Sequence, residues 1–247
     1  METTRQDRER EFHNRTFADH SRRGLEPVYA ILHDSKLYYR DFLQSHCAGK
    51  DVLEYGCGPG GHSRFLAENG ARLTGIDISE VAVQQASERA RTEQFSATFR
   101  VMDAEQLEFP DRSFDLICSV AILHHLDLRR AFSELARVLK PTGSAIFLEP
   151  LGHNPVINLY RMLTPHLRSP DEHPLLMKDL KLAETYFKRV ESRFFVLHSL
   201  LAVPFRNAPF FMKLVTGLEA VDRTLFRLVP FVRRYAWETV MVMSEPQ

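Results

Sequence analysis

Short apolar runs alternate with stretches of helical periodicity through the middle of the chain. Five such runs read DVLEY, RLTGIDI, ATFRVMD, FDLICSV and SAIFLEP. The intervening helical stretches cover about residues 60–69, a segment opened by Ser79, and LRRAFSELARVLK, which Pro141 and Gly143 are expected to end. This alternation predicts β-α-β units, and therefore an α/β protein built on a parallel sheet.

The flanking segments follow other patterns. METTRQDRERE forms a polar tail, and residues 12–46 predict one or two helices, with Pro27 in a first helical turn. After Pro150, a stretch rich in Pro and His predicts a long functional loop. Next come a helix in LLMKDLKLAETYF, a strand in VESRFFVLHSLL, an aromatic-rich helical insertion at about 203–231, and a closing strand in AWETVMVMS.

The length of 247 residues suits one α/β domain with insertions. We expect three parts: an N-terminal helical cap (1–45), a central core (46–150), and a part with the long loop, the insertion and the closing strands (151–247). The last part is expected to belong to the same domain as the core, because its strands can extend the same sheet.

Charge and cysteine content exclude several classes of protein. The chain has 32 basic and 32 acidic residues, which argues against a nucleic-acid partner held by a basic surface. Cys47, Cys57 and Cys118 are odd in number and widely spaced, so neither a disulfide framework nor structural zinc is expected. No apolar run approaches the roughly 18 residues of a membrane span, and the first residues lack a signal-peptide core. We therefore expect a soluble, cytoplasmic protein without stable membrane insertion.

The stretch VLEYGCGPGGHS places a glycine-rich loop directly after the first predicted strand. Gly56, Gly58 and Gly61 match the GxGxxG pattern of dinucleotide sites, although glycines alone could serve only a tight turn. Glu54 stands at the end of the strand, where its charge would oppose a pyrophosphate on the helix N-terminus. A ligand with a cationic amino group and a sulfonium, such as S-adenosylmethionine, would instead gain from that carboxylate.

EYGCGPGG resembles the first motif of class I S-adenosylmethionine-dependent methyltransferases, and further motifs follow in the family's order. The resemblance implies that Asp77 accepts hydrogen bonds from both ribose hydroxyls, and Ser79 is the better candidate for capping the next helix. It also implies that Asp103 accepts from the adenine amino group, with the Ala104 N–H facing the ring. A simple helix N-cap is the alternative interpretation of Asp103.

FDLICSVAILHHL and ARVLKPTGSAIFLEP are similar to the branch that includes ubiquinone, menaquinone and antibiotic-tailoring methyltransferases. The resemblance implies a Rossmann-like, doubly wound, mostly parallel seven-stranded sheet with an antiparallel last strand. N-terminal helices and a helical insertion before the last strand accompany it. The implied cofactor is S-adenosyl-L-methionine, bound by Glu54, Gly56, Cys57, Gly58, Gly60, Asp77, Ile78, Asp103, Ala104, Glu105 and Ser119.

Methyl transfer mainly requires alignment, because the cofactor supplies the reactivity. A general base would assist a hydroxyl or carbon acceptor, and His153 and His125 are the candidates at the ends of predicted strands. Of the two, His153 is the better candidate for facing the substrate. The neighbouring pair His124 and His125 occurs in relatives with different substrates, which favours a loop-fixing role for at least one of them. No acidic ligand cluster is evident, so we expect no metal.

The acceptor is expected to be a small, partly apolar metabolite of the secondary-metabolite type. Aromatic residues of the insertion, at helical spacing, favour a core or a homo-oligomer interface over a lid on a lipophilic acceptor. The base-methylating motif [NDS]-P-P-[YF] is missing after the fourth strand, which further disfavours nucleic acid. An NAD(P)-dependent reductase and a non-catalytic binding protein are the competing interpretations.

Overall fold

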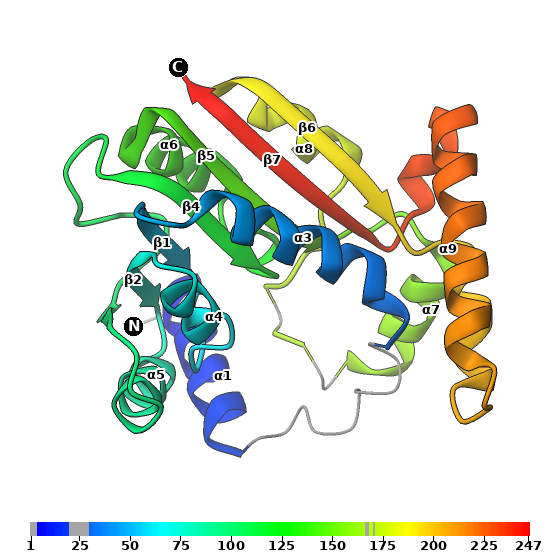
Figure 1. The fold of residues 1–247 in the computed structure, drawn as a ribbon, viewed down its shortest axis with the longest axis horizontal. Coiled ribbons are helices and arrows are strands. Elements are labelled where there is room, and N and C mark those ends of the chain that lie inside the picture. The colour runs from blue at the N-terminus through cyan, green and yellow to red at the C-terminus, as the bar shows by residue number, and fades with distance from the viewer. Residues whose placement is uncertain (1–3, 20–29, 166–167, 170) are drawn as a thin grey trace.

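The computed structural model describes residues 4–19, 30–165, 168–169 and 171–247. Its centre is one seven-stranded sheet with the strand order β3-β2-β1-β4-β5-β7-β6 (Figure 1). The strands are β1 (Asp51–Tyr55), β2 (Arg72–Asp77), β3 (Ala97–Val101), β4 (Phe114–Val120), β5 (Leu139–Pro150), β6 (Phe187–Phe195) and β7 (Glu238–Pro246). β7 runs antiparallel to both of its neighbours, and the other pairs are parallel. The predicted fold class is confirmed.

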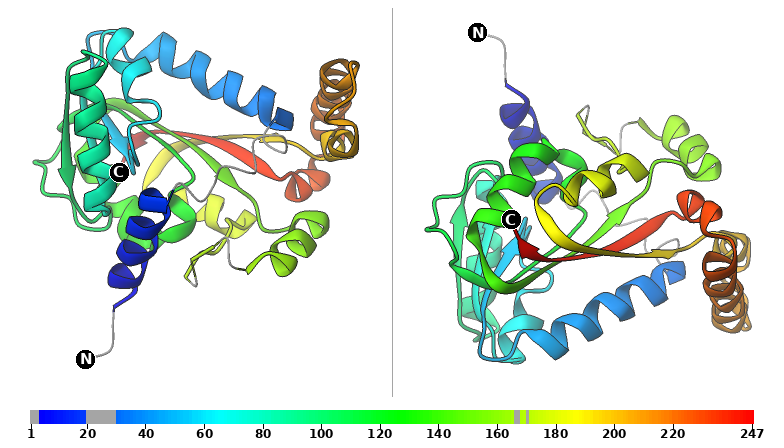
Figure 2. Two further views of the ribbon diagram at one scale, coloured as in Figure 1. Left: turned by 90° about the horizontal axis from the view of Figure 1, so that it is seen from below. Right: turned by 90° about the horizontal axis from the view of Figure 1, so that it is seen from above.

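Helices cover both faces of this sheet (Figures 1 and 2). The helices are α1 (Arg5–Asp19), α3 (His33–His46), α4 (Ser63–Glu68), α5 (Glu80–Thr92), α6 (Leu128–Val138), α7 (Pro155–Leu163), α8 (Met177–Ala183) and α9 (Phe211–Leu228). Short 3-10 helices are η1 (Ala30–Leu32), η2 (Leu123–His125), η4 (His198–Phe205) and η5 (Pro230–Tyr235). The closing strands β6 and β7 extend the same sheet as β1 to β5. The boundaries of the three expected parts, after residues 45 and 150, stay a prediction.

Alternating side chains of the central strands divide the core between the two faces. Val52 of β1 packs with Leu43 of α3 and Leu66 of α4, and all three are fully buried. The next residue, Leu53, points to the opposite face and packs in the cluster that contains Phe132 of α6. The period of two along a strand therefore explains why β1 is buried almost throughout, since both faces are covered.

The end of α6 differs from the prediction. α6 ends at Val138 and β5 begins at Leu139, so Pro141 and Gly143 lie inside the strand instead of ending the helix. The pairing of β4 with β5 is irregular there, with a register shift between Phe114 and Leu116. A Cβ atom at Gly143 would lie 2.9 Å from the carbonyl oxygen of Asp115, so the glycine permits the close approach of two strands.

Two helices occupy segments for which the sequence predicted a tail or a loop. α1 begins at Arg5, within the supposed polar tail, because its side chains make polar contacts with distant loops. α7 interrupts the predicted loop, and Asn154 begins it by accepting hydrogen bonds from the N–H groups of Val156 and Ile157. The predicted helix start at Pro27 lies outside the described residues.

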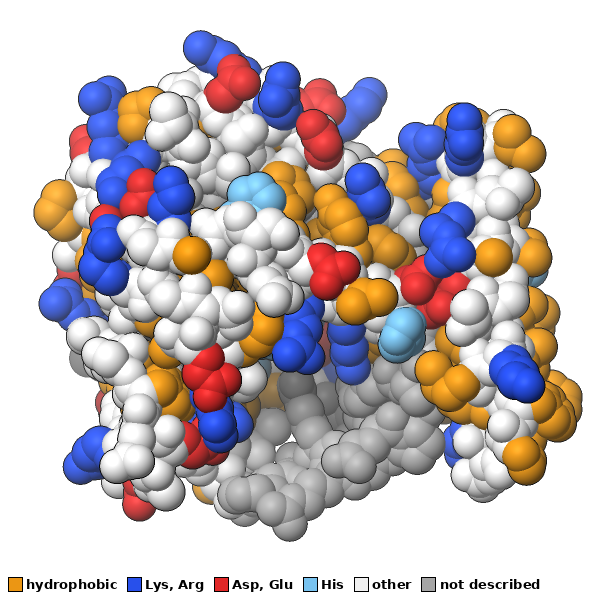
Figure 3. All heavy atoms as spheres, in the orientation of Figure 1, with side chains coloured by type: hydrophobic (Ala, Val, Ile, Leu, Met, Phe, Trp, Pro, Cys, Tyr) orange, Lys and Arg blue, Asp and Glu red, His pale blue; other side chains and the backbone are white. Residues whose placement is uncertain are grey.

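The outer surface has no marked segregation of charge on the face in Figure 3, where basic and acidic side chains are interspersed. Within the described ranges, no helix combines the length and apolar character needed to cross a membrane. All three cysteines, Cys47, Cys57 and Cys118, are unpaired and buried.

The insertion before β7 is anchored by one buried carboxylate. Asp222 of α9 is 2% exposed and accepts hydrogen bonds from the backbone N–H groups of Leu197 and His198, each at 2.9 Å. It also accepts from the hydroxyl of Ser199 at 2.9 Å. These donors lie at the start of η4, so Asp222 satisfies backbone groups that η4 leaves without intrahelical partners.

We predict that Asp222→Ala lowers the free energy of unfolding by about 3 kcal/mol, because several buried donors lose their acceptor together. Chemical denaturation of the purified variant measures the change. Arg227→Ala, an exposed change on the same helix, is the control and should leave stability within about 0.5 kcal/mol. Equal stability of both variants would refute the anchoring role.

Candidate functional site

A cavity of about 360 Å³ opens at the carboxyl ends of β1, β2 and β4. The strand order reverses between β1 and β4, because β2 lies on one side of this pair and β5 on the other. The loops that follow the two strands therefore diverge, and open α/β sheets bind ligands at such points. α1 supplies the outer wall through Arg5, Gln6, Glu9, His13 and Phe17.

The structure brings most of the residues expected to bind the cofactor into this cavity. Ten of them line it: Glu54, Gly56, Cys57, Gly58, Asp77, Ile78, Asp103, Ala104, Glu105 and Ser119. Gly60 does not line the cavity, although its neighbours Pro59 and Gly61 do. Gly60 has a φ of +78°, and its carbonyl oxygen accepts a hydrogen bond from Arg89, so its role lies in the shape of the loop.

The glycine loop requires residues without side chains at two positions that face the cavity. Gly56 has a φ of +75°, and a Cβ atom there would lie 2.4 Å from the Cδ1 atom of Ile122. Gly58 has a φ of +52°, and its Cβ would lie 3.5 Å from the ring of Phe17 in α1. Both positive φ values favour glycine, and at Gly56 the loop also lies close to the Ile122 side chain of the loop after β4.

Glu54 lies at the bottom of the cavity and is 4% exposed. Its carboxylate accepts hydrogen bonds from the backbone N–H of His62, at 3.3 Å, and from the hydroxyl of Ser63. Burial raises the pKa of Glu54 to about 7, despite these two hydrogen bonds. A cation bound beside it would favour the ionised carboxylate.

Asp77 connects the end of β2 to the glycine loop. One carboxylate oxygen accepts from the N–H of Gly58 and the other from the N–H of Ser79, both at 2.9 Å. Burial raises the pKa of Asp77 above its usual value. Ser79 caps α5 by accepting from the N–H of Ala82, so the capping role expected of Ser79 is confirmed.

Asp103 and its neighbours form the next part of the wall, after β3. One oxygen of Asp103 accepts from the N–H of Glu105 at 2.8 Å. The hydroxyl of Tyr55, at the end of β1, donates to the carbonyl oxygen of Ala104 at 2.5 Å. These bonds fix the backbone of this segment against the central strand.

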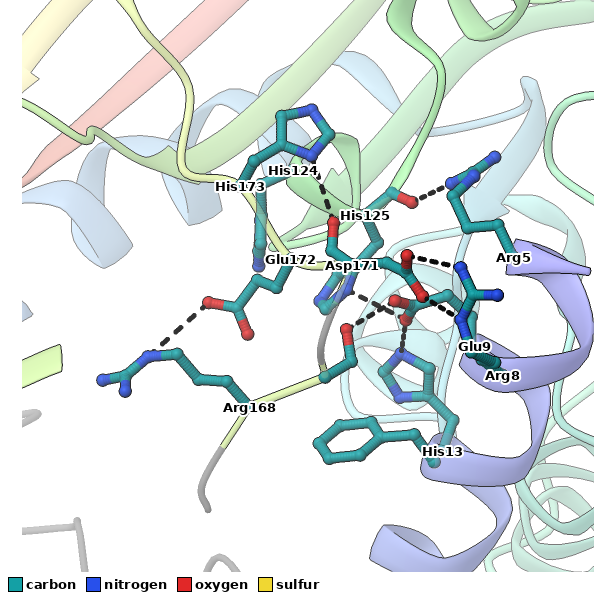
Figure 4. Close-up of polar contacts among 12 residues, drawn as sticks. Arg5, Arg8, Glu9, His13, His124, His125, Arg168, Asp171, Glu172 and His173 are labelled. Atoms are coloured by element: carbon teal, nitrogen blue, oxygen red, sulfur yellow. Dashed lines mark hydrogen bonds and ion pairs between the residues drawn. The ribbon is translucent and has the colours of Figure 1, made fainter. Parts of the chain in front are cut away.

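The contribution of α1 was missed by the sequence analysis. Arg5 donates to the carbonyl oxygen of His125 (Figure 4). It also donates to the carboxylate of Glu105, and the hydroxyl of Ser79 donates to the side chain of Asn14 at 2.6 Å. Apolar periodicity cannot find such a helix. Polar residues at a spacing of four, as in Arg5, Glu9 and His13, are the signal that could have found it.

The two adjacent histidines have different environments. His124 lies 2.7 Å from a carboxylate oxygen of Glu149 through its Nδ1 atom. The other oxygen of Glu149 accepts from the N–H groups of Ile122 and Leu123, so this pair fixes the loop after β4. That contact is the loop-fixing role expected for one member of the pair. His125 lines the cavity, and burial lowers its pKa.

His153 lies away from this cavity. Its Nε2 atom accepts a hydrogen bond from the N–H of Met177, the first residue of α8, at 3.3 Å. The sequence placed His153 at the end of a strand, and that position is correct. The loop after β5 directs the side chain toward the start of α8 instead of toward the cavity.

Residues 53–147 match the family model described as a methyltransferase domain. The chain is 45% identical over 97 residues to the 2-methyl-6-phytyl-1,4-hydroquinone methyltransferase of Synechocystis sp.. The aligned region covers 38% of this chain and 30% of that protein. It is also 34% identical over 140 residues to the ubiquinone biosynthesis O-methyltransferase of Coxiella burnetii. This aligned region covers 56% of this chain and 58% of that protein. The matches thus span 30% of the first relative and 58% of the second.

The fold is similar to that of phosphoethanolamine N-methyltransferase 2 of Haemonchus contortus, solved in complex with S-adenosyl-L-methionine. The TM-score is 0.66 with 21% sequence identity, over 96% of this chain and 60% of that chain. At this identity, the similarity extends to the arrangement of helices and strands.

Proposed function

This chain belongs to the class I S-adenosylmethionine-dependent methyltransferases, and from that membership we propose that it transfers a methyl group to a small acceptor molecule. The methyl carbon passes from the sulfonium of S-adenosyl-L-methionine to an acceptor atom by in-line displacement. The observation that carries the proposal is the convergence of Glu54, Asp77 and Asp103 with the glycine loop on one cavity.

Each of these carboxylates suits a different part of the cofactor. We assign Glu54 to the cationic amino group, because it is the buried carboxylate at the bottom of the cavity. Asp77 is assigned to the ribose hydroxyls, and Asp103 with Ala104 to the adenine. A pyrophosphate would meet three carboxyl groups here, which argues against a nicotinamide dinucleotide.

The acceptor is proposed to be a small, partly apolar molecule of the secondary-metabolite type. The cavity wall includes apolar side chains beside the carboxylates, among them Phe17, Met102, Ile122 and Leu126. The names of the two relatives describe quinone chemistry, which supports a ring that carries oxygen substituents. We also propose that the protein acts in the cytoplasm and has no nucleic-acid partner. A further proposal is that two or more copies associate through the aromatic insertion.

Catalysis is proposed to depend on alignment together with one histidine that acts on the acceptor. Of the two candidates, His125 lines the cavity and His153 does not, so the geometry favours His125. Orientation in a closed cavity contributes several kcal/mol to the rate without covalent catalysis. Replacement of His153 by Ala should therefore affect turnover less than replacement of His125.

We predict that Asp77→Ala weakens binding of S-adenosylmethionine by about 1 to 3 kcal/mol, or about 5- to 150-fold, because buried hydroxyls lose their acceptor. Isothermal titration calorimetry measures the change. Asp41→Ala, an exposed carboxylate of α3, is the control and should bind normally. Unchanged affinity in folded Asp77→Ala would contradict the assignment.

We predict that the affinity for S-adenosylmethionine increases about fivefold between pH 6 and pH 7. The pKa of Glu54 is raised to about 7 by burial, so at lower pH the carboxyl is protonated and does not attract the ammonium. Above about pH 7.7 the cofactor's own amino group loses its proton, so the increase should end there. Glu54→Gln should abolish the increase, and a persistent increase in that variant would assign it to another group.

The proposed activity is tested with methyl-labelled S-adenosylmethionine and a panel of hydroquinones, phenols and indoles, with mass spectrometry of the products. We expect label in at least one acceptor, and loss of that transfer in Asp77→Ala. Titration with NADH tests the alternative that the protein is an NAD(P)-dependent reductase. Tight binding of NADH without binding of S-adenosylmethionine would overturn the proposal, and cofactor binding without transfer to any acceptor would favour a non-catalytic protein.

A further inference from the structure

Three potential metal ligands meet on the wall of the cavity where α1 crosses η2 (Figure 4). Glu9 and His13 lie one turn apart on α1, and His125 is the last residue of η2. The Oε2 atom of Glu9 lies 3.4 Å from Nε2 of His13 and 3.1 Å from Nδ1 of His125. All three ligand atoms lie within 4.8 Å of one another.

Two of these atoms lack a hydrogen-bond partner although they are buried. They are Oε2 of Glu9 and Nδ1 of His125, which face each other without the alignment of a hydrogen bond. The side chains of Glu9 and His125 are only 6% and 8% exposed. Buried polar atoms of native proteins are rarely left in this state, because each costs about 1 to 3 kcal/mol. A water molecule or an ion that both atoms share would satisfy them.

The second oxygen of Glu9 has a different role. Oε1 accepts a hydrogen bond from the hydroxyl of Ser169, which fixes the carboxylate and leaves Oε2 directed toward the histidines. Such orienting hydrogen bonds are typical of carboxylates that bind metal ions. A second group of potential ligands consists of His124, His125 and Glu172. In that group, Glu172 already pairs with Arg161 at 2.8 Å and His124 already contacts Glu149.

The distances fit the coordination of a small divalent ion. A tetrahedral ion with bonds of about 2.0 to 2.1 Å holds its ligand atoms about 3.3 Å apart. The two separations from Glu9 Oε2, 3.4 and 3.1 Å, agree with this value. Two imidazoles and one carboxylate form a ligand set of Zn²⁺ or Fe²⁺ sites with open positions, whereas Mg²⁺ and Ca²⁺ prefer oxygen alone.

We propose that Glu9, His13 and His125 bind one divalent transition-metal ion of the zinc type in the wall of the cavity. The positions not occupied by protein face the cavity, where an oxygen atom of the acceptor can bind. This proposal replaces the expectation of a metal-free protein. Without an ion, the carboxylate of Glu9 contacts the imidazoles of His13 and His125.

The consequence for the acceptor rests on the proposed methyl transfer, in which His125 would then act on the acceptor through the ion that it binds. A hydroxyl group bound to the ion loses its proton to water more easily, and the O–H electron pair stays on oxygen. An acceptor with a hydroxyl at, or conjugated with, the methylated atom would then react as the more nucleophilic anion. Metal binding itself requires neither the acceptor nor the cofactor.

The test uses tag-free, full-length protein that has been dialysed against a chelator. We expect one equivalent of Zn²⁺ to bind in calorimetric titration, and Co²⁺ to give visible absorption bands typical of four or five ligands. Glu9→Gln and His13→Ala should each lower the affinity for Zn²⁺ at least tenfold. Glu11→Gln, whose carboxylate is 68% exposed on the same helix, is the matched control and should bind normally.

Circular dichroism and thermal unfolding verify that each variant is folded. Absence of Zn²⁺ and Co²⁺ binding to the folded parent protein would overturn the metal site, as would equal affinity of Glu9→Gln and Glu11→Gln. Because cofactor titration requires no metal, failure of the metal site and failure of the proposed methyl transfer give different results.

Discussion

The reversal of strand order beside β1 is the constraint on which the rest of the site depends. β1 and β4 are hydrogen-bonded neighbours, yet β2 and β5 lie on opposite sides of this pair. The two loops must therefore separate at the carboxyl edge, and a space remains that the sheet itself cannot fill. The close approach of Gly56 to Ile122 marks the point where the loops part.

The burial of carboxyl groups has an energetic cost in this fold. It raises the pKa values of Glu54, Glu149, Glu219 and Glu238 to about 7. In the unfolded chain these groups lose their protons near pH 4.5, so between about pH 4.5 and 7 the folded state holds more protons than the unfolded state. Their contribution to stability therefore decreases as the pH rises through that interval. Glu149 holds the loop that carries His125, so part of this cost serves the shape of the site.

The sequence predicted those features that depend on periodicity and on glycine. The β-α-β order, the loop after β1 and Asp77 at the end of β2 follow from local patterns, because buried strands need apolar runs and tight loops need glycine. α1 was missed, because its contacts are charged and its partners, such as Glu105 and Asp171, lie far along the chain. The direction of His153 could not be predicted either, since the position of α8 depends on tertiary packing.

The burial of Glu54 has a further consequence for turnover under the proposed assignment. The amino group that it would attract is present in the cofactor and in the demethylated product alike, because only the sulfonium loses its charge on transfer. Glu54 therefore cannot distinguish the two, and it retains the product as firmly as it holds the cofactor. The protein would then be subject to inhibition by the product of its own reaction.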